Sequence, residues 1–502
     1  MEISLDREHT TPLYRQIVTQ VIARIEDGSL PIGTLLPAER KLAAHLNVNR
    51  TTVVTAYRDL VATGMVEARV GRGTWVSDAV MDGANVPPPL AWQTLFSPAA
   101  ERLRDPVMRD MLAAMGRPGT ISLGAGAPAP ELFPVALFRR AMDEALDMHG
   151  PDLFVYGAVQ GWLPLREALV EWMARGGIRT TAEQVVVLHG SQQGLDLIAR
   201  VLLEPGDAVV VESPTYLGAL SVFRGAGARL LPVALDEDGM RMDLLEQILA
   251  RHRPKFIYTL PTYQNPTGVT MPLARRHALL ALAARYGVPT IEDDPYGDLH
   301  YGDEPPPRLA ALDRRGLVIY LSTMSKLFLP GLRLGWLAAP PPVAEAVTLA
   351  RQNSDVHPNS ATQHILHTFL TRGWLAEHVA ALRPAYQSRR DAMLAALDRM
   401  APAGMTWSEP VGGYFLWCHL PSGMRAEALA IEAAREGVSF VVGTAFSPSG
   451  NARDAIRLNF TGASEDEITE GVRRLTVAIR RLARRDVAPA RDDASTGPRP
   501  IV

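Results

Sequence analysis

The sequence predicts a multidomain protein in which a small α+β domain precedes a larger α/β domain. The chain has 502 residues, more than one ordinary hydrophobic core accommodates. Residues 10–77 combine three amphipathic helices with a short hairpin, and in residues 116–482 short apolar runs alternate with helices rich in Ala, Leu and Arg. Residues 78–115 form a Pro-containing linker between them, and residues 483–502 have the composition of a disordered tail.

The composition is that of a water-soluble globular protein, with 47% hydrophobic residues and a formal net charge of −3. The N-terminus lacks the apolar stretch of a signal peptide, and no apolar run is long enough to span a bilayer. We therefore expect a cytoplasmic bacterial protein without a membrane partner. Cys418 is the only cysteine, so no internal disulfide can form, and we expect it in the core. We expect no metal site.

A helix that ends at Gly28 opens the small domain. Its apolar side chains recur every four residues and so share one face: Leu13, Ile17, Val21 and Ile25. A second helix over residues 37–46 turns Leu42 and Leu46 inward. Both helices thus present one apolar face, as the helices of a small packed domain do.

Asn49 is predicted to cap a third helix, which runs from Arg50 to Thr63. The side chains expected to face the core are Val53, Tyr57, Leu60 and Val61, and those expected on the exposed N-terminal half are Arg50, Thr51, Thr52 and Thr55. In helix–turn–helix proteins this half of the last helix contacts base edges. A hairpin of residues 65–69 and 74–77 follows, and its tip, Val70–Gly73, can place Arg72 in a minor groove.

Three helices, a capped turn and a Gly-Arg-Gly tip, in this order, closely resemble the winged helix–turn–helix of GntR-type bacterial regulators. The motifs that carry the resemblance are Leu36–Ala43, Asn49–Thr52 and Gly71–Val76. The resemblance implies a double-stranded DNA operator as partner, and association with the nucleoid when the operator is bound. It also implies DNA contacts at Arg40, Arg50, Thr51, Thr52 and Arg72.

The larger domain is predicted to contain a mainly parallel sheet with both faces covered. The buried strands expected are Val185–Leu188, Ala208–Val211, Phe256–Tyr258, Pro289–Ile291 and Leu317–Leu321, with helices such as Gln192–Leu203 and Pro272–Tyr286 between them. In open sheets of this kind, ligands bind at the carboxyl ends of the strands.

Polar residues follow several of these strands. Asn265 can present an amide to a ligand, Asp293 can hold a pyridine nitrogen protonated, and Tyr296 can bond a phenolic oxygen. The start of a helix at residues 189–192 offers backbone N–H groups to phosphate, and Arg333 is suited to bidentate phosphate binding. Together they point to a phosphorylated pyridine cofactor.

Lys326 lies among these motifs in a chain that uses little lysine. Of its 51 Lys and Arg residues, only Lys41, Lys255 and Lys326 are lysines. A neutral amine can form a Schiff base, whereas a guanidinium stays protonated. The alternative is a surface lysine that has not been replaced by arginine.

Residues from about 120 to 480 resemble the fold-type I pyridoxal-phosphate aminotransferases of the aspartate aminotransferase class. By this resemblance Lys326 forms the internal aldimine and Asp293 pairs with the pyridinium nitrogen. The remaining cofactor contacts that it implies are Asn265 and Tyr296 at the phenolic oxygen, Tyr216 stacked on the ring, and Ser191, Gln192, Ser325 and Arg333 at the phosphate. Thr323 stands where relatives often have Ser and keeps the hydroxyl group.

Two further residues extend the resemblance. Arg457 matches the arginine that binds a substrate α-carboxylate, and Tyr156 matches the tyrosine that reaches the phosphate of the neighbouring subunit. The second match implies a homodimer.

A GntR-type domain fused to an aminotransferase-like domain is the layout of MocR/GabR-type regulators. The resemblance implies a transcription factor that senses a small amino compound, or pyridoxal phosphate itself, through aldimine chemistry at Lys326. It further implies a head-to-tail, domain-swapped dimer. Two alternatives remain open on the residues alone: a working aminotransferase that passes an amino group to a 2-oxo acid, and an architectural domain that binds cofactor without exchanging ligand.

Overall fold

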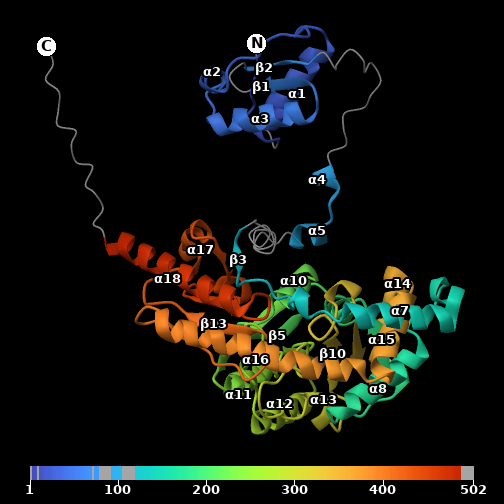
Figure 1. The fold of residues 1–502 in the computed structure, drawn as a ribbon. Helices are drawn as coiled ribbons and strands as arrows, with labels where there is room; N and C mark the ends of the chain where they lie inside the picture. Colours follow the sequence, from blue (N-terminus) through green and yellow to red (C-terminus); the bar gives the residue numbers. More distant parts are fainter. Residues whose placement is uncertain (1–2, 8–10, 70–72, 78–91, 104–118, 488–502) are drawn as a thin grey trace. The chain divides into compact units, whose positions relative to one another are not determined.

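The computed structural model describes residues 3–7, 11–69, 73–77, 92–103 and 119–487 (Figure 1). The contacts divide the chain into two compact units, Met1–Phe96 and Ser97–Val502, called here the small unit and the large unit. The division falls inside the predicted linker. Within the described residues, no helix is long and apolar enough to cross a membrane.

The small unit has the predicted order of three helices and a hairpin. Its elements are α1 (Leu13–Glu26), α2 (Glu39–His45), α3 (Arg50–Ala62), β1 (Val66–Arg69) and β2 (Gly73–Val76), followed by the short α4 (Trp92–Leu95). The strands β1 and β2 pair antiparallel, with Val66 opposite Val76. The hairpin tip, residues 70–72, lies outside the described residues, and so does Arg72.

The predicted apolar faces form the core of the small unit, with two exceptions. Leu13 is half-buried and lies outside the core cluster. Ile17, Val21, Val53 and Leu60 are fully buried. Val61, however, is 40% exposed, so the prediction that it faces the core is wrong. Leu60 already occupies the core position of that turn of α3, and the next residue lies about 100° further round the helix.

The large unit is built on a sheet of eight strands in the order β4-β11-β10-β9-β8-β5-β6-β7. The strands are β4 (Val185–Leu188), β5 (Ala208–Ser213), β6 (Arg229–Asp236), β7 (Gly239–Met240), β8 (Ile257–Thr259), β9 (Thr290–Asp293), β10 (Val318–Thr323) and β11 (Gly335–Ala338). The pairs among β10, β9, β8, β5 and β6 are parallel, as predicted. The strand β11, which the sequence did not predict, runs antiparallel between β10 and β4.

Helices cover both faces of this sheet, as expected for a parallel sheet. Successive side chains of a strand point to opposite faces, so Val186 and Leu188 join one core cluster while Val185 and Val187 join another. The first face is covered by α9 (Ser191–Leu202), α10 (Leu217–Gly225) and α14 (Pro341–Asp355). The second is covered by α8 (Leu163–Arg175), α11 (Met242–Arg251), α12 (Leu273–Tyr286) and α15 (Ser360–Thr371).

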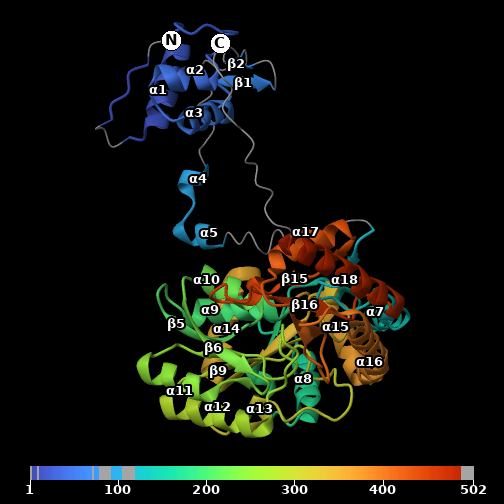
Figure 2. The same cartoon turned by 90° about the vertical axis from the view of Figure 1, so that its left-hand side faces the viewer.

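A smaller sheet in the order β12-β13-β16-β15 forms the C-terminal part of the large unit. Its strands are β12 (Thr406–Trp407), β13 (Phe415–His419), β15 (Val441–Val442) and β16 (Ala455–Asn459). The helices α16 (Trp374–Met400), α17 (Ala426–Arg435) and α18 (Glu465–Val487) belong to the same part, and α16 and α18 run side by side (Figures 1 and 2). Cys418, in β13, is buried as predicted.

The remaining elements connect these layers. They are α5 (Pro98–Arg102), β3 (Ile121–Ser122), α7 (Val135–His149), α13 (Leu309–Leu312), β14 (Val438–Ser439) and the 3₁₀ turns η2 (Pro130–Leu132), η3 (Gly150–Phe154), η4 (Ala182–Gln184), η5 (Pro330–Leu332) and η6 (Gly443–Phe446). The strand β3 comes soon after the linker in sequence and pairs in parallel with β14. It leads directly into residues 123–127, which reach the site described below.

Candidate cofactor and DNA-binding sites

A cavity of about 290 Å³ lies at the carboxyl ends of the parallel strands of the large unit. Ten predicted cofactor contacts and the predicted carboxylate-binding arginine line it: Ser191, Gln192, Tyr216, Asn265, Asp293, Tyr296, Thr323, Ser325, Lys326, Arg333 and Arg457. These residues span more than half of the chain. All except Arg457 come from the ends of five strands of the large sheet and the segments after them, and Arg457 lies in β16 of the smaller sheet. The sheet topology therefore brings together what the sequence keeps apart.

Lys326 projects into the cavity from the turn that follows β10. Its Nζ donates a hydrogen bond of 2.5 Å to the backbone oxygen of Gly126, and its own backbone oxygen accepts one of 2.7 Å from the Tyr414 hydroxyl. The loss of surrounding water, together with the positive charges of Arg457 and Arg333, lowers the pKa of Lys326 to about 8. About a tenth of the amine is thus neutral at pH 7, and nucleophilic use of the lysine requires this neutral form.

Asp293, at the end of β9, is buried and only half satisfied. Its Oδ2 accepts a hydrogen bond of 2.7 Å from the Tyr258 hydroxyl, while its Oδ1 has no partner among the described residues. Burial raises the pKa of Asp293 to about 7, against the effect of the Tyr258 hydrogen bond. A buried carboxylate oxygen without a donor, facing a cavity, is suited to an N–H group on a ligand.

Arg457, in β16, is buried against aromatic rings. Its guanidinium carbon lies 3.9 Å from the centroid of the Phe415 ring, and its Nη1 and Nη2 donate to Asn265 Oδ1 at 2.9 Å and to the backbone oxygen of Gly124 at 2.8 Å. Its Nε has no partner among the described residues. Burial lowers the pKa of Arg457 to about 10, and the side chain offers a fork of donors to a carboxylate.

The other end of the cavity is suited to phosphate. The helix α9 begins at Ser191, directly after β4, so its first backbone N–H groups point toward this end. Arg333 donates to Ser325 Oγ at 3.3 Å and to the backbone oxygen of His189 at 3.2 Å. A Cβ atom at Gly190 would lie 2.6 Å from the Arg333 guanidinium, so only glycine allows this approach.

Tyrosine side chains and Thr323 complete the walls. The Tyr216 hydroxyl donates to Gln192 Oε1 at 3.1 Å, and burial raises the pKa of Tyr216 to about 12. Tyr296 is buried and packs against the rings of Tyr414 and Phe415. Thr323 Oγ1 donates to Ser325 Oγ at 3.0 Å, so the threonine supplies the hydroxyl expected at this position.

The residues present fit pyridoxal phosphate. Asp293 Oδ1 lacks the donor that a pyridinium N–H would provide, the start of α9 and Arg333 lie where an anion would bind, and Lys326 supplies the amine. Asn265 and Tyr296 line the same cavity, as a contact to the phenolic oxygen requires. The donor set is therefore the one this cofactor needs.

Tyr156 lies outside the cavity. Its side chain is 85% exposed and contacts the ring of His357, with 5.5 Å between the ring centroids. The prediction that it reaches the phosphate of a neighbouring subunit concerns a second chain and stays a prediction.

The predicted DNA contacts that the structure describes lie at the start of α3 and on α2. Asn49 caps α3 as predicted, since its side chain accepts a hydrogen bond of 3.1 Å from the backbone N–H of Thr51. Arg50 and Thr51 are exposed and Thr52 is half-buried. Arg50 forms an ion pair of 3.0 Å with Glu39, and Arg40 is exposed on α2. These side chains are thus accessible to a partner.

Sequence reasoning missed several residues of the cofactor site. Tyr258, which bonds Asp293, was read only as part of a buried strand. Its place at the carboxyl end of β8, beside β9, was the signal that could have identified it. Phe415 and the backbone oxygens of Gly124 and Gly126 carry no polar sequence signal, and only the fold shows them.

The chain matches two family models. Residues 118–475 match aminotransferase class I and II, and residues 13–76 match the bacterial regulatory proteins of the gntR family. The LysN α-aminoadipate aminotransferase from Thermus thermophilus, solved in complex with N-(5'-phosphopyridoxyl)-L-leucine, superposes with a TM-score of 0.74 at 36% identity. The match covers 79% of this chain and 100% of that chain.

Two relatives show what the second domain adds. Aromatic-amino-acid aminotransferase 1 of Thermococcus litoralis is 40% identical over 399 residues, which cover 78% of this chain and 96% of that protein. The "Probable rhizopine catabolism regulatory protein MocR" of Rhizobium meliloti is 31% identical over 501 residues, 99% of each chain. The chain therefore belongs to the MocR-type regulators, which join a DNA-binding domain of the GntR family to a class I and II aminotransferase domain.

Proposed function

We propose that this protein is a transcriptional regulator whose large unit senses an amino compound through Lys326 and pyridoxal phosphate, and whose small unit binds operator DNA. When bound, pyridoxal phosphate supplies an aldehyde carbon that Lys326 and an incoming primary amine can hold in turn. The chain's own residues then decide which amines enter and what their binding changes. Because its partner is DNA, we expect the protein in the cytoplasm, on the nucleoid when bound.

One observation carries the sensing proposal: Lys326 and Arg457 both donate hydrogen bonds to the segment that follows the linker. Lys326 donates to the oxygen of Gly126 and Arg457 to that of Gly124. A cofactor bonded to the Lys326 nitrogen, or a ligand carboxylate bound to Arg457, takes up the groups that otherwise donate to Gly126 and Gly124. Ligand binding therefore changes the hydrogen bonding of residues 124–126.

The same segment is tied to the C-terminal part of the large unit. The N–H of Leu123 donates to the oxygen of Ser439 at 2.8 Å, and the oxygen of Leu123 accepts from the N–H of Asn459 at 2.7 Å. Asn459 is two residues from Arg457 in β16. Residues 121–127 thus lie between the ligand site and, along the chain, the linker to the DNA-binding domain. This gives the ligand a physical route to the linker.

The effector chemistry follows from the cavity. Arg457 is buried with aromatic rings around it, so a carboxylate that reaches it is removed from water and gains two charge-assisted hydrogen bonds. We therefore propose a small amine that also bears a carboxylate. Pyridoxal phosphate itself is the alternative signal.

We also propose a homodimer, arranged head to tail with exchanged domains. In its support, Tyr156 does not line the cavity of its own chain and stands in an exposed apolar run with Phe154 and Val155, which are 75% and 58% exposed. Exposed apolar runs of this kind mark protein interfaces. Sedimentation of the native chain and of a Phe154→Ser variant measures the association, and a native monomer would contradict it.

A second function, transamination, is favoured by the complete set of Lys326, Asp293 and Arg457 in one cavity and by the 40% identity to an aromatic-amino-acid aminotransferase. Absorbance of the cofactor separates the possibilities when the loaded protein is mixed with candidate amines. A shift that stops after one equivalent and changes DNA affinity supports the regulator. Repeated turnover with a 2-oxo acid and no effect on DNA affinity supports the enzyme. No spectral response to any amine supports an architectural domain.

A further inference from the structure

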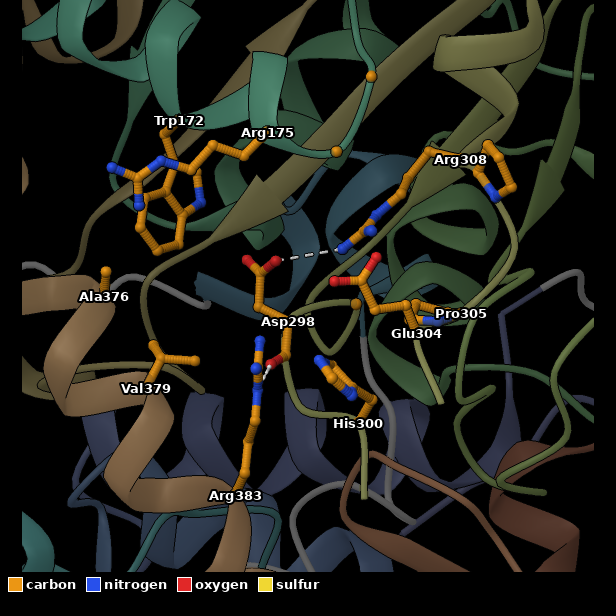
Figure 3. Close-up of a pocket in the computed structure, with 14 residues that line it drawn as sticks. Trp172, Arg175, Asp298, His300, Glu304, Pro305, Arg308, Ala376, Val379 and Arg383 are labelled. Carbon is orange, nitrogen blue, oxygen red and sulfur yellow. Dashed lines mark hydrogen bonds and ion pairs between the residues drawn. The ribbon is translucent and has the colours of Figure 1, made fainter. Parts of the chain in front are cut away.

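A second pocket, of about 470 Å³, lies apart from the cofactor cavity, between the end of α8, the loop after β9 and the first turns of α16 (Figure 3). It is called here the α8–α16 pocket. Its volume falls in the range of small-molecule sites. None of the residues that line it lines the cofactor cavity.

The positive charge of this pocket is incompletely neutralised. The guanidinium of Arg175 lies over the Trp172 ring, 5.0 Å from its centroid, and no ion pair of Arg175 is found among the described residues. Arg383, on α16, donates through Nε to the backbone oxygen of Asp298 at 2.9 Å, and in the same described part of the chain it has no carboxylate within ion-pair distance. Each therefore retains donors for an anionic group.

The pocket also holds negative charge. The carboxylate of Asp298 accepts from Arg308 Nη2 at 3.2 Å, and a third of its side-chain surface remains accessible. Glu304 is exposed, and across the described residues it has no hydrogen bond or ion pair. Figure 3 shows Asp298 in the middle of the labelled residues with Glu304 beside it, while Arg175 lies by Trp172 and Arg383 approaches Asp298 from below.

The wall between the charges is preorganised. Arg308 is buried and bridges two carboxylates, because its Nε donates to Asp294 at 3.0 Å while Nη2 holds Asp298. The charge of Arg308 is thus already compensated inside the protein. What remains for a ligand is Arg175, Arg383, the carboxylate of Glu304 and the accessible third of Asp298, around an apolar surface of Trp172, Val379 and prolines.

We propose that the α8–α16 pocket binds a free zwitterionic amino acid without covalent attachment, with the ligand carboxylate at Arg175 and Arg383 and its ammonium at Glu304 and Asp298. A simple anion would pair only with the arginines and a simple amine only with the carboxylates. A zwitterion pairs with both and leaves the net charge of the pocket unchanged. Apolar lining residues accommodate the body of the side chain. The site is independent of the cofactor and of Lys326.

Titration calorimetry of the cofactor-free native chain with each of the twenty common L-amino acids tests the proposal. We expect at least one to bind, and its decarboxylated and deaminated analogues to bind at least about tenfold more weakly, because each loses charge-assisted hydrogen bonds. If none of the twenty binds, or if either analogue binds as tightly as the amino acid, the proposal is wrong.

Variants then locate the binding. Arg383→Gln and Glu304→Gln, the second at an exposed position that does not threaten folding, are each expected to weaken binding at least about tenfold. Arg139→Gln, at an exposed arginine on α7, is the control and leaves the binding within about twofold. If Arg457→Gln, in the cofactor cavity, abolishes binding of the amino acid while Arg383→Gln and Glu304→Gln do not, the amino acid binds in the cofactor cavity and the proposal is wrong.

Discussion

The predicted DNA-binding surface and the predicted cofactor cavity differ in how far their side chains are removed from water. In the small unit the Arg50 side chain is 54% exposed, and it pairs with a carboxylate that is itself 36% exposed. In the large unit Arg457 is 4% exposed and Asp293 is 2% exposed. The same kind of side chain, an arginine, thus serves in a solvated surface and in a dry pocket.

Because of this difference in burial, the structure gives more information about the ligand of the cavity than about the DNA operator. Burial shifts the pKa values of Lys326, Asp293 and Arg457, and it leaves the Oδ1 of Asp293 without a donor among the described residues. The shape of the cavity and its buried charged groups therefore indicate the shape and charge of the ligand. The exposed residues of α3 carry no such record, since water satisfies them when DNA is absent. The structure of this chain therefore does not reveal the operator sequence, whereas the buried donors and acceptors of the cavity indicate the chemistry of the cofactor.

The largest expected effect is at Lys326. Replacing it with Ala removes the amine that holds the cofactor, so the absorbance of the lysine-bound cofactor should disappear completely. Operator affinity should stay within a modest factor, because Lys326 lies in the large unit. Lys255→Ala, at an exposed lysine paired with Asp207, is the matched control and should keep the absorbance. Complete loss of DNA binding in Lys326→Ala would mean that the lysine is structural.

A second prediction concerns the pH dependence that burial gives to Asp293. With a pKa raised to about 7, folded Asp293 keeps a proton between about pH 4 and 7 that the unfolded chain has already released. The free energy of unfolding of the cofactor-free large unit should therefore fall as the pH rises through this window. Asp293→Asn has no such proton, so its advantage over the native chain should grow by about 1–3 kcal/mol from pH 4 to pH 7.

Urea unfolding of the large unit at a series of pH values measures this advantage. Asp303→Asn, at an exposed position in the loop that follows β9, serves as the control for a lost carboxylate. An advantage of Asp293→Asn that does not change with pH would show that Asp293 is ionised in the fold.

The smallest effect is expected on the solvated surface. Arg50→Ala should weaken operator binding by roughly 1–3 kcal/mol if Arg50 contacts a base. Arg58→Ala, an exposed arginine two turns further along α3, is the matched control and should cost less. Titration of labelled operator by fluorescence anisotropy measures both, and equal affinities for native protein and Arg50→Ala would remove Arg50 from the interface.

The polar residues that the sequence predicts for the cofactor site line one cavity because they follow strands. Asn265, Asp293 and Lys326 each come after an apolar run, and parallel strands bring their carboxyl ends to one edge. The prediction missed Tyr258, because a tyrosine inside an apolar run is read as core. Val61 failed for a related reason, since an apolar residue at a helix boundary is assigned inward although α3 turns it outward. The sequence did not predict the α8–α16 pocket, because Trp172, Asp298 and Arg383 lie far apart in sequence and only packing brings them together.

The central claim is that a ligand in the buried cavity changes binding at the exposed DNA surface. The most direct test is the affinity of the cofactor-loaded protein for an operator selected from random DNA, with and without an amine that shifts the cofactor absorbance. We predict a change of at least about fivefold, a typical lower bound for coupled sites, and its loss in Arg457→Gln for a carboxylate-bearing amine. An operator affinity that stays the same while the absorbance shifts would contradict the claim.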